Sequence, residues 1–205
     1  MGSVSALKHA LSRLRLAAHP RSILELGAGD GSLLLRLAGA LRPRWPDVKL
    51  TLLDRQHIVD SETVERYRRH GWEATTVCED ALVWARQAAH QPYDLTIATL
   101  FLHHFQDSDL RELLRGVVSH SRAFIAIEPR REVLAKVGSR LIGLLGTNAV
   151  TREDAAKSVA AGFTDDEITA AWPATAATWW TQEFRVLPFS HGFIAAQNDA
   201  RITHA

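Results

Sequence analysis

The sequence predicts a doubly wound α/β domain, in which helices cover both faces of a mostly parallel sheet. Two observations lead to this fold class. Between residues 22 and 129, short apolar runs alternate with longer segments of helical periodicity, and this alternation is typical of parallel sheets with helical crossovers. The last two apolar runs, 178–189 and 191–197, are separated only by a turn near Ser190. They predict an antiparallel hairpin at one edge of the sheet.

Apolar spacing and breaker residues define the elements in order. Residues 3–18 carry apolar side chains at helical spacing and end at His19-Pro20, so they predict an amphipathic N-terminal helix. Ser61 is expected to begin the helix that Gly71 ends. The other segments are predicted as strands 22–29, 49–54, 72–80, 93–102 and 122–129, helices 30–41, 61–71, 81–90, 107–120, 131–146 and 151–161, and a short helical stretch at 165–173. With the hairpin, the sheet has seven strands.

Composition limits the function classes. The chain has 205 residues, of which 46% are hydrophobic and 23% are charged, so one domain with a single core is expected. A formal net charge of +1 gives no general attraction to nucleic acid or to an anionic membrane. No apolar run is long enough to span a bilayer. The one cysteine, Cys78, excludes an intramolecular disulfide and a cysteine-based metal cluster, and it favours a cytoplasmic location.

A glycine-rich segment, Glu25-Leu26-Gly27-Ala28-Gly29-Asp30-Gly31, lies between the first predicted strand and the first crossover helix. Glycines there allow a sharp turn and a close approach of the backbone to a ligand, and the N–H groups of the helix start face that ligand. A dinucleotide fingerprint requires G-x-G-x-x-G or Ala. Here the third glycine comes one position early, and Ser32 stands where the last small residue should be.

The pattern E-x-G-x-G-x-G instead resembles the first motif of class I S-adenosylmethionine-dependent methyltransferases. The resemblance covers most of the chain, because the strand order, the acids after the second and third strands and the terminal hairpin also match that family. It implies a Rossmann-like fold and S-adenosylmethionine as the cofactor. We expect a single domain over 1–205, with the N-terminal helix in 1–19, the cofactor-binding core in 20–130, acceptor-side helices in 131–175 and the hairpin in 176–197.

The resemblance also implies roles for three acids. Asp54 stands at the ribose-binding position, Asp80 at the position that holds the adenine amino group, and Glu25 at the position that contacts the amino end of methionine. Two of these acids have an alternative role, because Asp54 and Asp80 can cap the turn or helix that follows. The carboxylate of a half-buried Glu25 needs a partner, which favours a role in binding. The other predicted cofactor-binding residues are Gly27, Ala28, Gly29, Gly31, Arg55, Ala81 and Thr99.

The segment from Thr99 to Phe105 contains the L-H-H-F pattern and resembles many small-molecule methyltransferases. Methyl transfer is an in-line displacement, and orientation alone can supply roughly 7–11 kcal/mol of the acceleration. A phenolic acceptor with a pKa of about 10 also gains from a base. His104 is the first candidate and His103 the second, because neighbouring residues on an extended segment point in opposite directions; a purely structural His104 is the alternative. No metal is expected, since this segment has no aspartate.

Acceptor binding is predicted in the segment between the fifth and sixth strands. Residues 147–154 resemble small bacterial methyltransferases associated with polyketide-type phenolic metabolites, and Asn148, Arg152 and Asp154 are the candidates there. The arginines after Glu128 are interpreted as solvated surface charge, and the late tryptophans as core rather than as an acceptor pocket. The N-terminal helix either closes over the cofactor or covers a face of the sheet.

The sequence thus favours methyl transfer to a small molecule, most simply the O-methylation of a phenol, quinol or polyketide-like compound of secondary metabolism. Two other classes remain open: a non-catalytic cofactor-binding or scaffold protein of the same fold, and a nicotinamide-dependent oxidoreductase. A nucleic-acid substrate is disfavoured by the near-neutral charge. The sequence does not define the oligomeric state.

Overall fold

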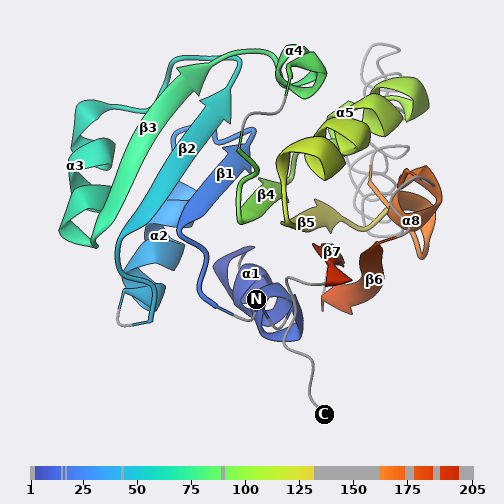
Figure 1. Ribbon diagram of the computed structural model, residues 1–205, viewed down its shortest axis with the longest axis horizontal. Helices are drawn as coiled ribbons and strands as arrows, with labels where there is room; N and C mark the ends of the chain where they lie inside the picture. The colour runs from blue at the N-terminus through green and yellow to red at the C-terminus, as the bar shows by residue number, and fades with distance from the viewer. Residues whose placement is uncertain are drawn as a thin grey trace, which may run out of the picture.

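The computed structural model describes residues 3–14, 16, 18–42, 44–88, 91–131, 162–173, 178–186 and 190–198. These residues form a seven-stranded sheet with the order β3-β2-β1-β4-β5-β7-β6 (Figure 1). The strands are β1 (Ser22–Leu26), β2 (Val48–Asp54), β3 (Trp72–Cys78), β4 (Leu95–Thr99), β5 (Ala123–Pro129), β6 (Trp179–Val186) and β7 (Ser190–Gln197). The first five strands pair in parallel, and β7 runs antiparallel to both β5 and β6. The predicted fold class is confirmed.

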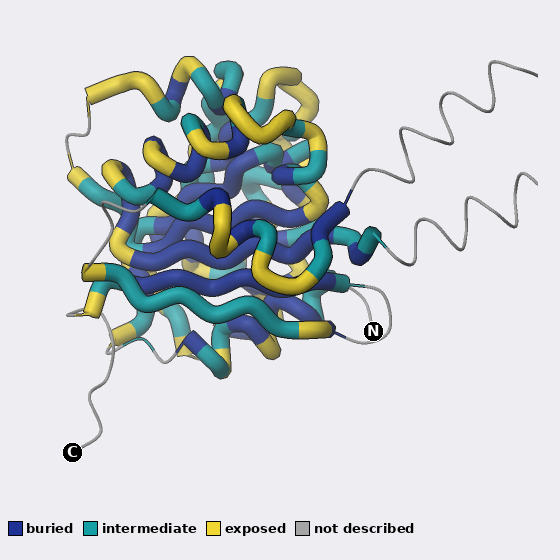
Figure 2. The backbone as a smooth tube through the Cα atoms, turned by 90° about the vertical axis from the view of Figure 1, so that its right-hand side faces the viewer, coloured by how far each residue is buried: buried dark blue, intermediate teal, exposed yellow. Residues whose placement is uncertain are grey.

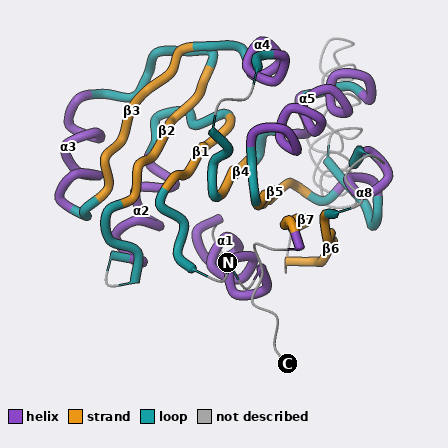
Figure 3. Tube along the Cα trace, in the orientation of Figure 1, coloured by secondary structure: helices purple, strands orange, loops and turns teal. Residues whose placement is uncertain are grey.

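Helices cover both faces of the sheet (Figure 3). One face packs against α1 (Ser3–Leu14), α2 (Ser32–Leu41) and α3 (Ser61–Arg69), and the other against α4 (Ala81–Arg86), α5 (Asp107–His120) and α8 (Glu167–Ala171). The strands β1, β4, β5 and β7 between these layers are almost entirely buried, whereas most residues of the edge strands β3 and β6 are half-buried or exposed (Figure 2). The central strands appear in the sequence as continuous apolar runs because helices cover both of their faces. Within the described residues, no helix is long and apolar enough to cross a membrane.

The structure corrects two details of the predicted elements. The fourth strand ends at Thr99, and Leu102–His104 forms a short 3-10 helix instead of continuing the strand. Asp60, not Ser61, caps α3, because its carboxylate accepts the N–H of Thr63 at 2.7 Å. The predicted helix 151–161, and the predicted helix 131–146 apart from Arg131, lie outside the described residues.

The N-terminal helix α1 packs against β5, β7 and α2. Its Leu7 and Leu14 side chains are fully buried, and the guanidinium of Arg13 lies 4.8 Å from the ring centre of Phe184 on β6. The helix therefore covers a sheet face. Its contacts do not place it over the ends of the strands where the candidate site lies.

Aromatic side chains fill the opposite face near the hairpin. The ring of Trp172, just after α8, lies 5.1 Å from that of Phe193 and 6.0 Å from that of Phe124, and Trp179 lies 5.4 Å from Trp172. Trp172 and Trp179 thus belong to the core packing, as the sequence favoured.

Candidate active site

The glycine turn follows β1 and is built by backbone geometry. Gly27, Gly29 and Gly31 all have positive φ angles, of 68°, 57° and 73°, a conformation that other L-residues adopt only with strain. The N–H groups of Gly27 and Ala28 both donate to the carbonyl of Leu53 on β2, at 2.9 and 3.0 Å. The turn is therefore fastened to the carboxyl end of the neighbouring strand.

The glycines differ in what surrounds them. A Cβ atom on Gly27 would stand 2.2 Å from the ring of Phe101, whereas one on Gly29 would meet nothing within 4 Å. The carbonyl of Gly31 accepts the buried hydroxyl of Tyr67 at 2.7 Å. Gly27 thus allows a close contact with an aromatic ring, and Gly29 keeps the turn open on its outer side.

Asp54, the last residue of β2, joins that strand to the glycine turn. Its Oδ2 accepts the N–H of Gly29 at 2.8 Å and its Oδ1 accepts the N–H of Gln56 at 2.9 Å. Each carboxylate oxygen has two lone pairs, so both retain capacity for a ligand hydroxyl. The predicted role in capping the next turn and the predicted role in binding are therefore compatible.

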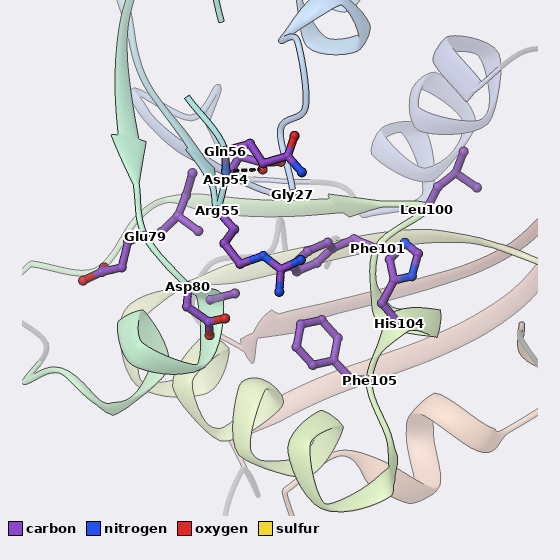
Figure 4. Close-up of a pocket in the computed structure, with 12 residues that line it drawn as sticks. Gly27, Asp54, Arg55, Gln56, Glu79, Asp80, Leu100, Phe101, His104 and Phe105 are labelled. Carbon is purple, nitrogen blue, oxygen red and sulfur yellow. Dashed lines mark hydrogen bonds between the residues drawn. The ribbon is translucent and has the colours of Figure 1, made fainter. Parts of the chain in front are cut away.

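A cleft of about 440 Å³ opens beyond the carboxyl ends of the parallel strands. Figure 4 shows the acids that follow β2 and β3 on one side, residues that follow β4 on the other, and the side chain of Arg55 extending between them. The lining residues are Gly27, Leu53, Asp54, Arg55, Gln56, Glu79, Asp80, Ala81, Leu100, Phe101, His104 and Phe105.

Asp80 lines this cleft and also caps α4. Its Oδ1 accepts the N–H of Leu82 at 2.8 Å, and the adjacent Ala81 lines the cleft as well. Neighbouring Glu79 accepts the amide of Gln87 at 2.7 Å. The Asp80 carboxylate therefore has one oxygen committed to the helix and one available to a bound molecule.

Two buried polar atoms close to the turn have no hydrogen-bond partner in the described structure: Oε2 of Glu25 and Oγ1 of Thr99. Glu25 is only 2% exposed. Burial raises its pKa well above the ordinary value, and the nearby carboxylates of Asp30 and Asp54 raise it further. An unpaired buried acid is costly, and a cationic amine would satisfy it. These acceptors, together with Asp54 and Asp80, fit S-adenosylmethionine.

The turn after β4 is organised by Glu128, which is completely buried near the end of β5. Its Oε1 accepts the N–H groups of Phe101 and Leu102 at 3.0 and 2.9 Å, and its Oε2 lies 2.7 Å from Nδ1 of His103. A carboxylate oxygen only accepts, so Nδ1 carries the proton of this pair. Leu100 has a positive φ of 55°, and this anchoring holds it in that strained conformation.

The two histidines are placed differently from the prediction in one respect. Because residues 102–104 form a 3-10 helix, the side chains do not point to opposite sides; their ring centres are 4.1 Å apart. His104 lines the cleft, whereas His103 is tied to Glu128. Partial burial lowers the pKa of His104, the His103 imidazole lowers it further, and Glu128 acts in the opposite direction.

The structure brings most of the predicted residues to one edge of the sheet. Some predicted cofactor-binding residues do not line the cleft itself. Ala28, Gly29 and Gly31 belong to the glycine turn, and Glu25 and Thr99 lie in β1 and β4 beside it. The acceptor candidates, Asn148, Arg152 and Asp154, lie outside the described residues. No group of three or more His, Cys, Asp or Glu side chains is placed to hold a metal ion within the described ranges.

The interpretation of the arginines after Glu128 as solvated charge was wrong for Arg130, whereas the Arg131 side chain is 40% exposed. Arg130 is only 6% exposed, and Arg131 pairs with Glu167 of α8 at 2.7 Å. The backbone explains why Arg130 is buried. Arg130 directly follows β5 and pairs with Phe163 in an isolated β-bridge, so it lies beside another segment of the chain.

Five residues of the site were not named individually from the sequence, although Leu100, Phe101 and Phe105 lie in the segment that carries the L-H-H-F resemblance and Glu128 ends the fifth predicted strand: Gln56, Leu100, Phe101, Phe105 and Glu128. Glu128 had a signal, because alternation along β5 places it on the same buried face as Phe124 and Ala126. A charged residue on a buried face needs a built environment. The other four follow strands, where local sequence does not define the direction of a side chain.

Comparisons with known proteins show what the domain and the fold are similar to. Residues 23–123 match the family model described as a methyltransferase domain. No curated protein sequence matches the chain. The fold is similar to that of an O-methyltransferase family protein from Burkholderia thailandensis, with a TM-score of 0.62, 14% identity and coverage of 94% of this chain and 56% of that one.

Another similar structure is the plantazolicin methyltransferase BpumL, in complex with a pentazolic desmethylPZN analogue and SAH. The TM-score is 0.63 at 15% identity, and the alignment covers 95% of this chain and 84% of that one. A Nostoc punctiforme PCC 73102 protein with a provisional O-methyltransferase description gives a TM-score of 0.64 at 15% identity, covering 95% of this chain. The chain spans only 56% of that protein's length.

The family match covers the glycine turn and the acids after β2 and β3, and the structural similarity extends over nearly the whole chain. Residues 23–123 therefore match a methyltransferase domain, and the chain has the fold of the solved methyltransferases to which it is similar.

Proposed function

We propose that this protein transfers the methyl group of S-adenosylmethionine to an oxygen atom of a small molecule, such as a phenol, quinol or polyketide-like compound. One observation carries the proposal: the glycine turn, Asp54, Asp80 and His104 converge on a single cleft. The cofactor supplies an electrophilic methyl group on a sulfonium. The named structural relatives include O-methyltransferase family members and an enzyme bound to a natural-product analogue, which supports an acceptor of this size.

Different residues along the sheet edge contact different parts of the cofactor and the acceptor. Asp80 and Asp54 offer carboxylate oxygens to the adenine amino group and the ribose hydroxyls, and Glu25 offers a buried carboxyl group to the methionine amine. Opposite them, His104 receives the proton of the acceptor hydroxyl. The histidine suits this task because its lowered pKa keeps it neutral, and thus basic, at physiological pH.

Sheet topology favours this function over nicotinamide chemistry. Dinucleotide-binding sheets have the order 3-2-1-4-5-6, whereas here the antiparallel β7 lies between β5 and β6. An exposed, free Cys78 is consistent with a reducing compartment such as the cytoplasm. Secondary metabolism is the setting that such acceptors suggest.

The test combines binding and turnover. Calorimetric titrations with S-adenosylmethionine and with NAD, run side by side, should detect binding of the former alone. Transfer of labelled methyl groups to a panel of phenols and quinols should then follow. Binding of NAD without S-adenosylmethionine would overturn the proposal, while cofactor binding without transfer to any acceptor would favour the non-catalytic alternative.

Replacing Asp54 with alanine is expected to weaken S-adenosylmethionine binding about ten- to a hundredfold, because charge-assisted hydrogen bonds contribute roughly 1.5–3 kcal/mol. The Gly29 contact is lost as well. Titration calorimetry measures the change. Asp54→Asn serves as the control, since it keeps one acceptor oxygen and should lose less affinity. An unchanged Kd in the alanine variant would remove Asp54 from the cofactor site.

The turnover rate is expected to rise with pH through a pKa below 6.5 and then level off, because only neutral His104 accepts a proton. In His104→Ala this limb should disappear, and the rate at neutral pH should fall roughly 10²- to 10⁴-fold. The pH profile of kcat with a phenolic acceptor measures both effects. His103→Ala is the comparison variant; should it abolish the limb while His104→Ala keeps it, the base is His103.

A further inference from the structure

The order of the strands determines the order in which the cofactor's parts can lie. Along the sheet edge, the acid assigned to adenine follows β3, the acid assigned to ribose follows β2, the glycine turn follows β1, and His104 follows β4. A sulfonium that donates its methyl group must lie between the adenosine and the acceptor. If the proposed function holds, it therefore lies at the boundary between β1 and β4.

Phe101 occupies this boundary. Its ring stands so close to Gly27 that a Cβ there would be only 2.2 Å away, and the ring also lines the cleft. The backbone N–H of Phe101 is held by the buried Glu128, and the ring of Phe105 packs edge-on at 5.1 Å. The backbone of Phe101 is thus anchored, and its ring packs against Gly27 and Phe105. Figure 4 shows its side chain between those of Arg55 and His104.

Among the described residues, no carboxylate that lines the cleft follows β1 or β4. The Glu128 carboxylate at this boundary is completely buried and is already bonded to the Phe101 and Leu102 N–H groups and to His103. The lining carboxylates, Asp54, Glu79 and Asp80, all follow β2 or β3 on the adenosine side. A sulfonium carries a permanent positive charge but no N–H or O–H, so a hydrogen-bond acceptor gains little from it. An aromatic face attracts such a cation through its quadrupole and needs no donor.

We propose that the ring of Phe101 binds the sulfonium by a cation–π contact, and that it makes the protein prefer the charged methyl donor over the neutral product S-adenosylhomocysteine. The product carries a thioether in place of the sulfonium and loses this attraction. Phe101 is therefore a specificity-determining residue that favours exchange of product for fresh donor.

The test is the ratio of two dissociation constants, for S-adenosylhomocysteine and S-adenosylmethionine, measured by calorimetry without any acceptor. Phe101→Leu removes the π face and is expected to lower this ratio about two- to thirtyfold. Phe101→Tyr keeps the face and should keep the ratio. Phe184→Leu is the matched control, because it makes the same replacement on β6, at a residue that does not line the cleft, and its ratio should match the wild type.

An unchanged ratio in Phe101→Leu would overturn the inference. If the affinity for both ligands falls in parallel, the ring contributes packing alone; if neither affinity changes, the ring does not contact the cofactor. Thermal denaturation checks the fold, and Phe101→Met, of similar volume and without a π face, replaces the leucine variant if that one unfolds. The proposed function fails separately, if the wild-type protein binds neither ligand.

Discussion

Replacing Glu128 with glutamine is expected to lower the free energy of unfolding by about 3 kcal/mol, because hydrogen bonds to a charged group contribute roughly 1.5–3 kcal/mol each and several are affected. The buried carboxylate accepts the backbone N–H groups of Phe101 and Leu102, accepts that of His103 at a longer distance of 3.4 Å, and bonds to the His103 imidazole. The glutamine amide keeps one acceptor oxygen but turns a donor toward these donors. Urea denaturation measures the loss.

Two comparison variants separate the contributions. Glu79→Gln changes a carboxylate on the other side of the cleft and is expected to stay within about 0.5 kcal/mol of the wild type. His103→Ala removes one partner of Glu128 and leaves the backbone contacts, so its loss should be smaller than that of Glu128→Gln. If Glu128→Gln unfolds at the same urea concentration as the wild type, Glu128 does not hold this turn.

Gly27→Ala is expected to destabilise the protein by about 2–5 kcal/mol. A positive φ of 68° costs an L-residue roughly 1–2 kcal/mol, and the collision with the Phe101 ring adds about 1–3 kcal/mol. Gly29→Ala is the matched control, since its φ of 57° carries a similar cost but its Cβ meets no atom within 4 Å. The difference between the free energies of unfolding of the two variants gives the energetic cost of the collision with the Phe101 ring.

A double mutant tests the physical cause. Combining Gly27→Ala with Phe101→Leu should recover part of the lost stability, because the smaller, flexible side chain can move away from the new methyl group. Equal losses in Gly27→Ala and Gly29→Ala would mean that Phe101 is free to shift, and the close contact would then have no energetic consequence.

The sequence predicted those parts of the site that depend on local signals. The glycine turn is contiguous, and the acids Asp54 and Asp80 each follow an apolar run directly. In a parallel sheet, the ends of such runs meet at one edge, so topology alone brings these residues together. The structure places both acids in the lining of one cleft.

The parts that the sequence did not predict depend on contacts between distant segments. Glu128 acts on a turn about 25 residues earlier in the chain, and nothing near either segment specifies the other. The same anchoring bends residues 102–104 into a 3-10 helix, which is why the assumed extended geometry of His103 and His104 was wrong. Asn148, Arg152 and Asp154 stay predictions, since they lie outside the described residues.

The placement of β7 has a consequence for biosynthesis. This strand, residues 190–197, pairs with both β5 and β6, and α1 at the other end of the chain packs against it. Until residues 190–197 have left the ribosome, the nascent chain carries an open edge along β5, and α1 lacks one of its packing partners. Completion of the sheet must therefore await these residues, and until then the edge of β5 can pair with another chain.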